Sequence, residues 1–366
     1  MLQIGSVQLD VPVVQAALAG YSDAPMRLIA RRQGAPYALH EVVLDKVVLQ
    51  PGKSGRQLFD IGDEDHPIGG QLMGADPARL AEAAWRIADS GFDVVELNFA
   101  CPVRKVLGRC RGGFLLSDPF TAIEIIRDVR AAVPAEIPVT LKMRRGTDDS
   151  AASVRNFFRI FDGACEHGLA AVTVHGRTVA QRYVGPSDWG FLARVKRHAG
   201  DKTVLGSGDL FSADDVVRMR EETGVDGVTI ARGCIGNPWI FREARALLSG
   251  RPLPDPPTVA EQGRVIREHF ELSLACHGEK RAQRIMRKFG IKYGELHPFA
   301  EKVRDAFVRC RSRADWLRVL DEWYAPARSW PSARRKTNPG KPIAGSGTVL
   351  RSTAKPGRGH PASSTA

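Results

Sequence analysis

The sequence predicts an α/β fold, namely a (β/α)8 TIM barrel followed by a small all-helical domain and a disordered basic tail. Eight short apolar runs alternate with amphipathic stretches over roughly the first 240 residues, which matches the size of a closed barrel. A proline-rich break at residues 249–257 then precedes four further helical patterns. An open doubly wound sheet is the alternative, but no Gly-x-Gly-x-x-Gly motif opens a helix after the first strand.

The barrel elements follow one another along residues 1–250. Apolar and β-branched runs predict strands over residues 11–19, 37–43, 68–73, 94–98, 139–143, 171–175, 203–206 and 227–231. Amphipathic periodicity predicts helices between them, including residues 77–90, 119–133, 151–167 and 213–223. Because the strands are apolar throughout rather than alternating, both faces of the sheet are expected to be buried.

A second domain is predicted over residues 255–324. Helical patterns cover residues 259–277, 280–293, 299–310 and 314–324. Basic residues recur at three- and four-residue spacing in the second of these helices, among them Arg284, Arg287 and Lys288. A charged helix face is usually only solvated, so this pattern alone does not establish a binding surface.

The net charge of +12 belongs mostly to the C-terminal end. Residues 325–366 hold eight Lys or Arg and no Asp or Glu, which leaves a net charge of about +4 for the rest of the chain. Their Pro, Gly, Ser and Thr content predicts disorder, either as a phosphate-attracting segment or as a solubilising tail. No apolar run could cross a bilayer and no signal peptide is evident, so we expect a cytoplasmic protein without a membrane partner.

Among six cysteines, only Cys101 has a motif around it. The others are scattered without the spacing of a zinc or iron–sulfur site, so no metal is expected. Cys101 lies in Asn98-Phe99-Ala100-Cys101-Pro102, directly after a predicted strand. A thiol with a pKa near ~8.5 is mostly protonated at neutral pH and can donate a proton without acting as a nucleophile. A buried structural cysteine is the alternative.

Other polar residues also stand where predicted strands end, at the edge where TIM barrels bear their active sites. They are Gln71, Asn98, Lys142, Arg144, His175 and Arg177. Lys142 could form an ion pair, form a Schiff base or place a cation beside an electron-rich ring such as a flavin. The two amides could be satisfied core groups or could bind a ring edge.

The last two strand ends suggest a phosphate site. Ser207, Gly208 and Asp209 follow the seventh strand, and Ala231 and Arg232 follow the eighth. Glycines let backbone N–H groups approach phosphate oxygens, and an arginine adds a charge-assisted contact. The helix that starts near residue 212 is expected to add its positive N-terminal end.

Together these segments resemble the tRNA-dihydrouridine synthase family from about residue 15 to residue 243. The matching segments are Ala19-Gly20-Tyr21-Ser22-Asp23-Ala24-Pro25-Met26-Arg27, Gly70-Gln71-Leu72, Cys101-Pro102-Val103-Arg104-Lys105-Val106, Leu141-Lys142-Met143-Arg144, His175-Gly176-Arg177-Thr178 and Ala231-Arg232-Gly233. The cysteine segment and the His-Gly-Arg-Thr segment are specific together. The region after residue 255 matches the family's RNA-binding domain only loosely.

The resemblance implies an oxidoreductase that uses FMN and NADPH to reduce uridine to dihydrouridine in RNA, with tRNA as the expected substrate, and that acts as a monomer. Hydride would reach C6 of the uracil from the flavin, and Cys101 would protonate C5. The implied FMN contacts are Ala17, Leu18, Ala19, Gln71, Lys142, His175, Ser207, Gly208, Asp209, Ala231 and Arg232. Substrate contacts would come from Asn98, Arg144, Arg177, Arg284, Arg287 and Lys288.

Two other functions remain open at this point. The first is an FMN-dependent dihydroorotate or dihydropyrimidine dehydrogenase-like enzyme that acts on free pyrimidine, since such enzymes place a cysteine on a similar loop. The second is a non-catalytic RNA-binding protein on a decayed barrel. The His-Gly-Arg-Thr segment and the basic helical domain disfavour the first, and the retained Cys101, Lys142 and Arg232 disfavour the second.

Overall fold

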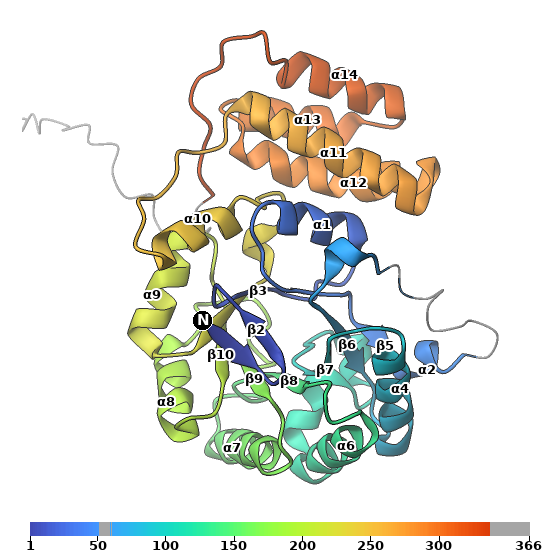
Figure 1. The fold of residues 1–366 in the computed structure, drawn as a ribbon, viewed down its shortest axis with the longest axis vertical. Coiled ribbons are helices and arrows are strands. Elements are labelled where there is room, and N and C mark those ends of the chain that lie inside the picture. Colours follow the sequence, from blue (N-terminus) through green and yellow to red (C-terminus); the bar gives the residue numbers. More distant parts are fainter. Residues whose placement is uncertain (51–58, 60, 337–366) are drawn as a thin grey trace, which may run out of the picture.

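The computed structural model describes residues 1–50, 59 and 61–336, and it confirms the predicted barrel. Parallel strands pair in the order β4-β3-β11-β10-β9-β8-β7-β6-β5, and an additional β4–β6 pairing closes the ring (Figure 1). The barrel strands are β3 (Val13–Gln15), β4 (Ala38–Leu39), β5 (Val43–Leu44), β6 (Ile68–Met73), β7 (Val94–Phe99), β8 (Val139–Arg144), β9 (Ala171–His175), β10 (Val204–Ser207) and β11 (Gly227–Ile230).

Helices surround the barrel because each crossover between parallel strands buries one apolar face against the sheet. They are α1 (Ala24–Arg32), α2 (Asp45–Val48), α4 (Pro77–Asp89), α5 (Arg104–Leu107), α6 (Pro119–Ala132), α7 (Ala151–Glu166), α8 (Trp189–Ala199), α9 (Ala213–Thr223) and α10 (Ile240–Leu248). Several of them start at an aspartate cap followed by proline. In α4 and α6, for instance, the Asp76 and Asp118 side chains accept the N–H groups of Arg79 and Thr121.

Two predicted strands differ from the observed ones. The run over residues 11–19 forms a strand only at β3, because the chain then turns and the Leu18 N–H donates to Ser22 Oγ at 2.8 Å. The run over residues 37–43 is divided into β4 and β5. Both run parallel to β6, β4 beside Ile68–Gly69 and β5 beside Leu72–Met73, so this segment is one barrel strand interrupted by an extra residue.

An N-terminal hairpin that the sequence analysis did not identify covers one end of the barrel. Strands β1 (Leu2–Ile4) and β2 (Val7–Leu9) pair in antiparallel orientation and lie across the barrel opening in Figure 1. Their apolar side chains pack with barrel-interior residues such as Val14, Tyr37 and Leu205. Because this end is closed by apolar packing, a site within the barrel must open at the opposite end.

The helical domain consists of α11 (Val259–His277), α12 (Glu279–Tyr293), α13 (Ala300–Arg309) and α14 (Arg313–Trp323), at the positions that the sequence predicts. It lies beside α1 of the barrel (Figure 1) and has its own aromatic core, in which Phe270 stacks on Trp316 with ring centroids 4.7 Å apart. Within the described part of the chain, no helix is long and apolar enough to span a bilayer.

The segment after α14 corrects the predicted start of the tail. Residues 325–336 do not leave the domain but return to the barrel: Arg335 pairs with Glu243 at 2.6 Å, and Lys336 donates to the carbonyl of Ile235 at 2.7 Å. Buried partners for these two cations hold the segment down although its composition predicts disorder. The predicted tail beyond residue 336 lies outside the described residues.

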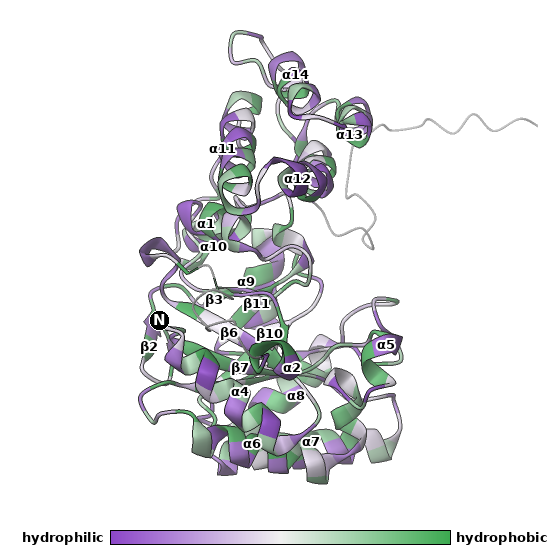
Figure 2. Ribbon diagram, turned by 90° about the vertical axis from the view of Figure 1, so that its right-hand side faces the viewer, coloured by the Kyte–Doolittle hydropathy of each residue, from purple (hydrophilic) through white to green (hydrophobic). Residues whose placement is uncertain are grey.

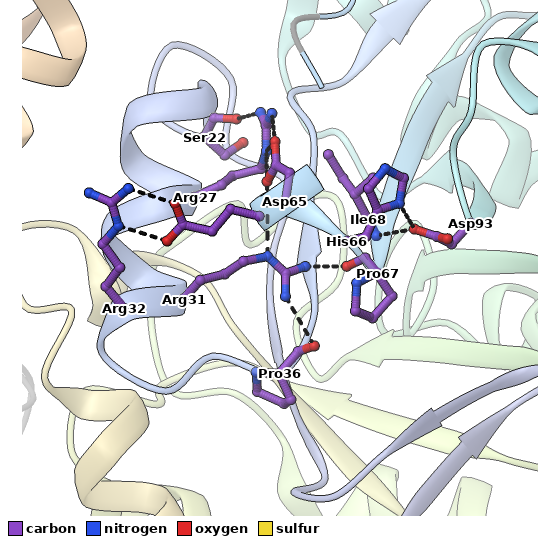
Figure 3. Close-up of polar contacts among 11 residues, drawn as sticks. Ser22, Arg27, Arg31, Arg32, Pro36, Asp65, His66, Pro67, Ile68 and Asp93 are labelled. Atoms are coloured by element: carbon purple, nitrogen blue, oxygen red, sulfur yellow. Dashed lines mark hydrogen bonds and ion pairs between the residues drawn. The ribbon is translucent and has the colours of Figure 1, made fainter. Parts of the chain in front are cut away.

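A buried ion pair joins α1 to the segment that leads into β6. The Arg27 and Asp65 side chains are both about 1% exposed and meet at 2.5 Å, and Arg27 Nη1 also donates to the Ser22 carbonyl at 3.0 Å. Figure 3 shows Arg31 beside this pair, with its guanidinium donating to the carbonyls of Pro36 and Pro67. These contacts hold the loop between β3 and α1 against the barrel.

Candidate active site

Strand register brings the predicted polar residues together at the open end of the barrel. Asn98 pairs with Lys142 between β7 and β8, and His175 pairs with both Arg144 and Ser207 on the neighbouring strands. Adjacent partners in a parallel sheet point to the same side, and these side chains point inward. The structure therefore gathers most of the predicted strand-end residues at one end of the barrel interior.

Cys101 lies on the loop after β7, and its backbone is held on both sides. Asn98 Oδ1 accepts the N–H groups of Ala100 at 2.9 Å and of Cys101 at 3.2 Å. The Cys101 carbonyl accepts the Gly113 N–H at 3.1 Å, and Arg144 Nε donates to the Ala100 carbonyl at 2.8 Å. Burial raises the pKa of the half-buried Cys101 thiol, so the thiol is neutral at physiological pH.

Lys142 is a buried cation that faces a buried carboxylate. Burial lowers the pKa of Lys142 to about 8, although the negative charge of Glu96 acts in the opposite direction. Glu96 accepts a hydrogen bond from Gln71 Nε2 at 2.5 Å. Glu96 was not among the predicted site residues, although strand alternation places it on the same strand face as Asn98, two residues earlier.

The loops after β10 and β11 form a small pocket whose walls are partly backbone. It is lined by His175, Ser207, Gly208, Asp209, Leu210, Phe211, Thr229, Ala231, Arg232 and Gly233. A Cβ on Gly208, whose φ is +121°, would lie 2.3 Å from Ser187 Oγ, and one on Gly233 would lie 2.0 Å from the Leu210 carbonyl oxygen. Both positions therefore need glycine, which lets backbone N–H groups approach a bound anion.

Asp209 organises the arginines of this pocket. Its carboxylate accepts from Arg177 Nη2 at 2.7 and 2.8 Å and from the Ser187 N–H at 2.8 Å, and it lies 3.6 Å from Arg232. Arg177 also donates to the Gly185 carbonyl and is only 3% exposed. The Arg177 side chain is thus directed into the protein between two loops rather than toward bulk solvent.

The helix that starts near residue 212 begins with a capping box. Ser212 and Asp215 form a capping box at the start of α9, in which each side chain accepts a backbone N–H from the other's position. Asp215 also accepts the Phe211 N–H at 3.2 Å. The Asp215 carboxylate thus accepts backbone N–H groups at this helix end, whereas Gly208, Gly233 and Arg232 line the pocket itself.

His175 is neutral in this environment. Burial and the positive charges of Arg144, Lys142, Arg177 and Arg232 lower its pKa well below the usual value. Its Nδ1 is 3.1 Å from the Arg177 backbone N–H and accepts from it, so the proton resides on Nε2. An imidazole in this state can donate one hydrogen bond into the pocket without adding charge.

Arg144 and Tyr183 form part of the rim. Arg144 Nη1 donates to the carbonyls of Thr178 and Arg182, both at 2.8 Å, so it links the cysteine loop to the loop after β9. Tyr183 was not selected from the sequence; its ring lies 5.5 Å from the Arg144 guanidinium and 4.9 Å from that of Arg232. The exposed Tyr183 ring is thus held between two cations at the mouth of the site.

The loop that follows β3, with Ala17, Leu18 and Ala19, is attached to the helical domain. Lys288 Nζ donates to the Gly20 carbonyl at 2.8 Å and lies 4.8 Å from the Tyr21 ring. His277 pairs with Asp23 at 2.8 Å. Of the residues predicted to contact RNA, Lys288 also contacts the barrel loop and is exposed, Arg284 is exposed, and Arg287 is half-buried.

The residues around the pocket do not suggest a metal centre. No group of three or more His, Cys, Asp or Glu side chains is placed to hold a metal ion in the part of the chain that the structure describes. The site instead combines a buried ammonium, two amides, a neutral imidazole, a neutral thiol and an arginine-bearing pocket. Fold and site together define a TIM-barrel protein whose ionisable and amide side chains gather at the open end of the barrel.

Comparison with known proteins identifies the family. A sequence model of the dihydrouridine synthases matches residues 14–327, so the chain belongs to the dihydrouridine synthase family. It is 36% identical over 332 residues to a probable tRNA-dihydrouridine synthase of Mycobacterium tuberculosis, covering 87% of this chain and 84% of that one. It is also 36% identical over 310 residues to tRNA-dihydrouridine synthase B of Pseudomonas aeruginosa, covering 84% and 91%.

Solved structures with a similar fold are more distant. A histamine dehydrogenase from Rhizobium sp. 4-9 superposes with a TM-score of 0.53 at 16% identity, covering 74% of this chain and 50% of that one. A 2-naphthoyl-CoA reductase superposes with a TM-score of 0.51 at 14% identity, covering 69% and 52%. This chain therefore spans about half the length of these proteins, and the likeness shows the barrel fold alone.

Proposed function

We propose that this protein reduces uridine to 5,6-dihydrouridine in tRNA, with FMN as its cofactor and NADPH as the reductant. The observation that carries the proposal is the neutral Cys101 thiol, whose backbone is held by Asn98 at the barrel end where Asn98 and Lys142 lie on neighbouring strands. Membership of the dihydrouridine synthase family and relatives named as tRNA-dihydrouridine synthases support the same activity.

The pocket residues fit FMN. The close-approach backbone at Gly208 and Gly233, together with Arg232, suits the phosphate. Thr229 lines this pocket, and its buried hydroxyl has no hydrogen-bond partner among the described residues. Lys142 and Gln71 would hold the polar edge of the ring, where an ammonium stabilises negative charge, and Leu18 would pack on a ring face.

Bound FMN, once reduced by NADPH, would supply the hydride that reaches C6 of the uracil. Cys101 then gives its Sγ proton to C5 as the C5=C6 double bond is lost, and solvent reprotonates the thiolate. Because its pKa is raised, the Cys101 thiol is protonated before the reaction and can donate this proton. Asn98 fixes the loop that carries the thiol, and the neutral His175 offers an Nε2 proton to a uracil carbonyl.

The helical domain would bind the RNA beside the pocket. A uridine stacked in folded RNA must be turned out before its C5 and C6 can enter a barrel. In Figure 2, α12 is largely hydrophilic and lies on the side of the molecule that bears α5, away from the β1–β2 hairpin. The exposed Arg284 on this helix suits a phosphate, and the Tyr183 ring at the rim suits stacking.

The decisive test is to map dihydrouridine in RNA from cells with and without this protein and to repeat the reaction with purified components. We expect one or more tRNA uridines to remain unmodified without the protein and to be reduced in vitro by protein, FMN and NADPH. If free uracil were reduced as well as tRNA, a free-pyrimidine enzyme would replace the proposal. A colourless protein that binds RNA without turnover would indicate a non-catalytic binder.

Replacing Arg284 with alanine is expected to weaken tRNA binding through the loss of one phosphate contact. The slope of log K against log salt should become shallower by about 1, because each neutralised phosphate releases roughly one counterion. Binding titrations at several salt concentrations measure this slope. Arg159→Ala removes an equally exposed arginine from α7, on the outside of the barrel, and should leave the slope unchanged. Equal slopes for the two variants would contradict the assignment.

A further inference from the structure

Beneath the thiol loop lies a chain of buried hydrogen bonds that begins at Glu96. Glu96 accepts from Gln71 Nε2 at 2.5 Å, and Gln71 Oε1 accepts from Asn98 Nδ2 at 2.6 Å. Asn98 Oδ1 in turn accepts the N–H groups of Ala100 and Cys101. Three inward-facing side chains on two adjacent strands therefore connect the barrel interior to the backbone that carries the thiol.

The direction of every bond in this chain is determined by its two ends. Backbone N–H groups can only donate, so the oxygen of Asn98 must face Ala100 and Cys101 and its nitrogen must face Gln71. The amide of Gln71 must then present its oxygen to Asn98 and its nitrogen to Glu96. A carboxylate only accepts, so Glu96 favours the same orientation of both amides from the opposite end of the chain.

The charge of Glu96 is matched within the barrel. Burial raises its pKa, whereas the ammonium of Lys142 and the hydrogen bond from Gln71 act in the opposite direction. An uncompensated carboxylate at 3% exposure would be costly, and the buried lysine on the next strand offsets that cost. The acceptor and its counter-charge thus belong to one buried unit.

We propose that Glu96 is a positioning residue for Cys101, acting through the side-chain amides of Gln71 and Asn98. Its carboxylate holds the Gln71 amide, Gln71 holds the Asn98 amide, and the Asn98 oxygen then holds the backbone from which the thiol reaches the substrate. This inference rests on the proposed function for its catalytic meaning. The mechanical part, the control of the thiol loop by a carboxylate inside the barrel, can be measured without turnover.

The test compares Glu96→Met with Glu96→Gln in the full-length protein. Methionine keeps the volume but accepts no strong hydrogen bond, so amide hydrogen exchange at Ala100 and Cys101 should become at least about fivefold faster. The rate at which iodoacetamide labels Cys101, measured relative to the rate for the exposed Cys110, should change as well. Glutamine still offers a carbonyl oxygen to Gln71, so Glu96→Gln should retain most of the protection.

Thr140→Val is the matched control, because Thr140 pairs with Glu96 on the adjacent strand and is also buried. This substitution removes a polar group at the same level of the barrel and should leave hydrogen exchange at the Ala100 and Cys101 amides unchanged. If Glu96→Met does not fold, Gln71→Met interrupts the same chain of hydrogen bonds. It must then accelerate hydrogen exchange at the Ala100 and Cys101 amides. Wild-type protection in a folded Glu96→Met protein, or an equal loss in Glu96→Gln, would overturn the proposal.

Activity is measured separately so that the two ideas can fail independently. With wild-type protein active on tRNA, Glu96→Met should lower kcat for uridine reduction and leave the KM for tRNA unchanged. An inactive wild-type protein would refute the proposed function, while the exchange experiment would still decide whether Glu96 controls the loop.

Discussion

Cys101→Ala is expected to lower the rate of uridine reduction by about 10²- to 10⁴-fold, the usual contribution of a positioned general acid. The alanine variant should still bind FMN, because the thiol offers a proton rather than a cofactor contact. The backbone groups of residue 101 would keep their bonds to Asn98 and Gly113, so the loop should also keep its shape. Single-turnover kinetics with pre-reduced protein would measure the loss, and visible absorbance would measure the bound flavin.

Cys110→Ala is the matched control for this experiment. Cys110 lies close to Cys101 in the chain but is exposed, so its removal should leave the rate unchanged. A Cys101→Ala protein that lost its flavin would show that the thiol supports the cofactor site. A variant that retained the wild-type rate would assign the proton to another group.

Asp65→Ala is expected to lower the free energy of unfolding by about 3–5 kcal/mol, because it removes the buried carboxylate that the Arg27 guanidinium contacts. Figure 3 shows the pair between α1 and the segment before β6, with Ser22 bonded to the same arginine. The loop that carries Leu18 would lose an anchor together with this pair. Urea denaturation followed by circular dichroism measures the change.

Asp63→Ala supplies the comparison, since Asp63 lies in the same 3-10 turn, η1 (Asp63–Asp65), but is exposed. Its replacement should change stability by less than about 0.5 kcal/mol. The double variant Arg27→Met with Asp65→Leu should recover part of the lost stability, because it removes both charges and restores apolar packing. Equal losses in the Asp63 and Asp65 single variants would mean that the ion pair does not hold this region.

Local pattern was sufficient to predict the barrel and the inward-facing strand ends. Gln71, Asn98 and Lys142 could be placed there because side chains alternate along a strand and parallel strands end at a common edge. The N-terminal hairpin was not foreseen because its three-residue strands carry almost no periodic signal. The same alternation also places the Glu96 side chain inside the barrel. The residues around Glu96 in the sequence, however, do not distinguish a carboxylate of the site from a carboxylate of the core.

The sequence alone determined the barrel, the helical domain and the candidate thiol with its neighbours, because these features depend on periodicity and short motifs. The tertiary structure alone shows what the long cationic side chains contact. Arg177 pairs with Asp209, Lys288 reaches the Gly20 carbonyl, and Lys336 returns to the barrel loop beside Arg232. A long, flexible Lys or Arg side chain can reach several acceptors, and the packing of loops distant in sequence decides which acceptor lies within its reach. Residue spacing in the sequence therefore does not predict the partner.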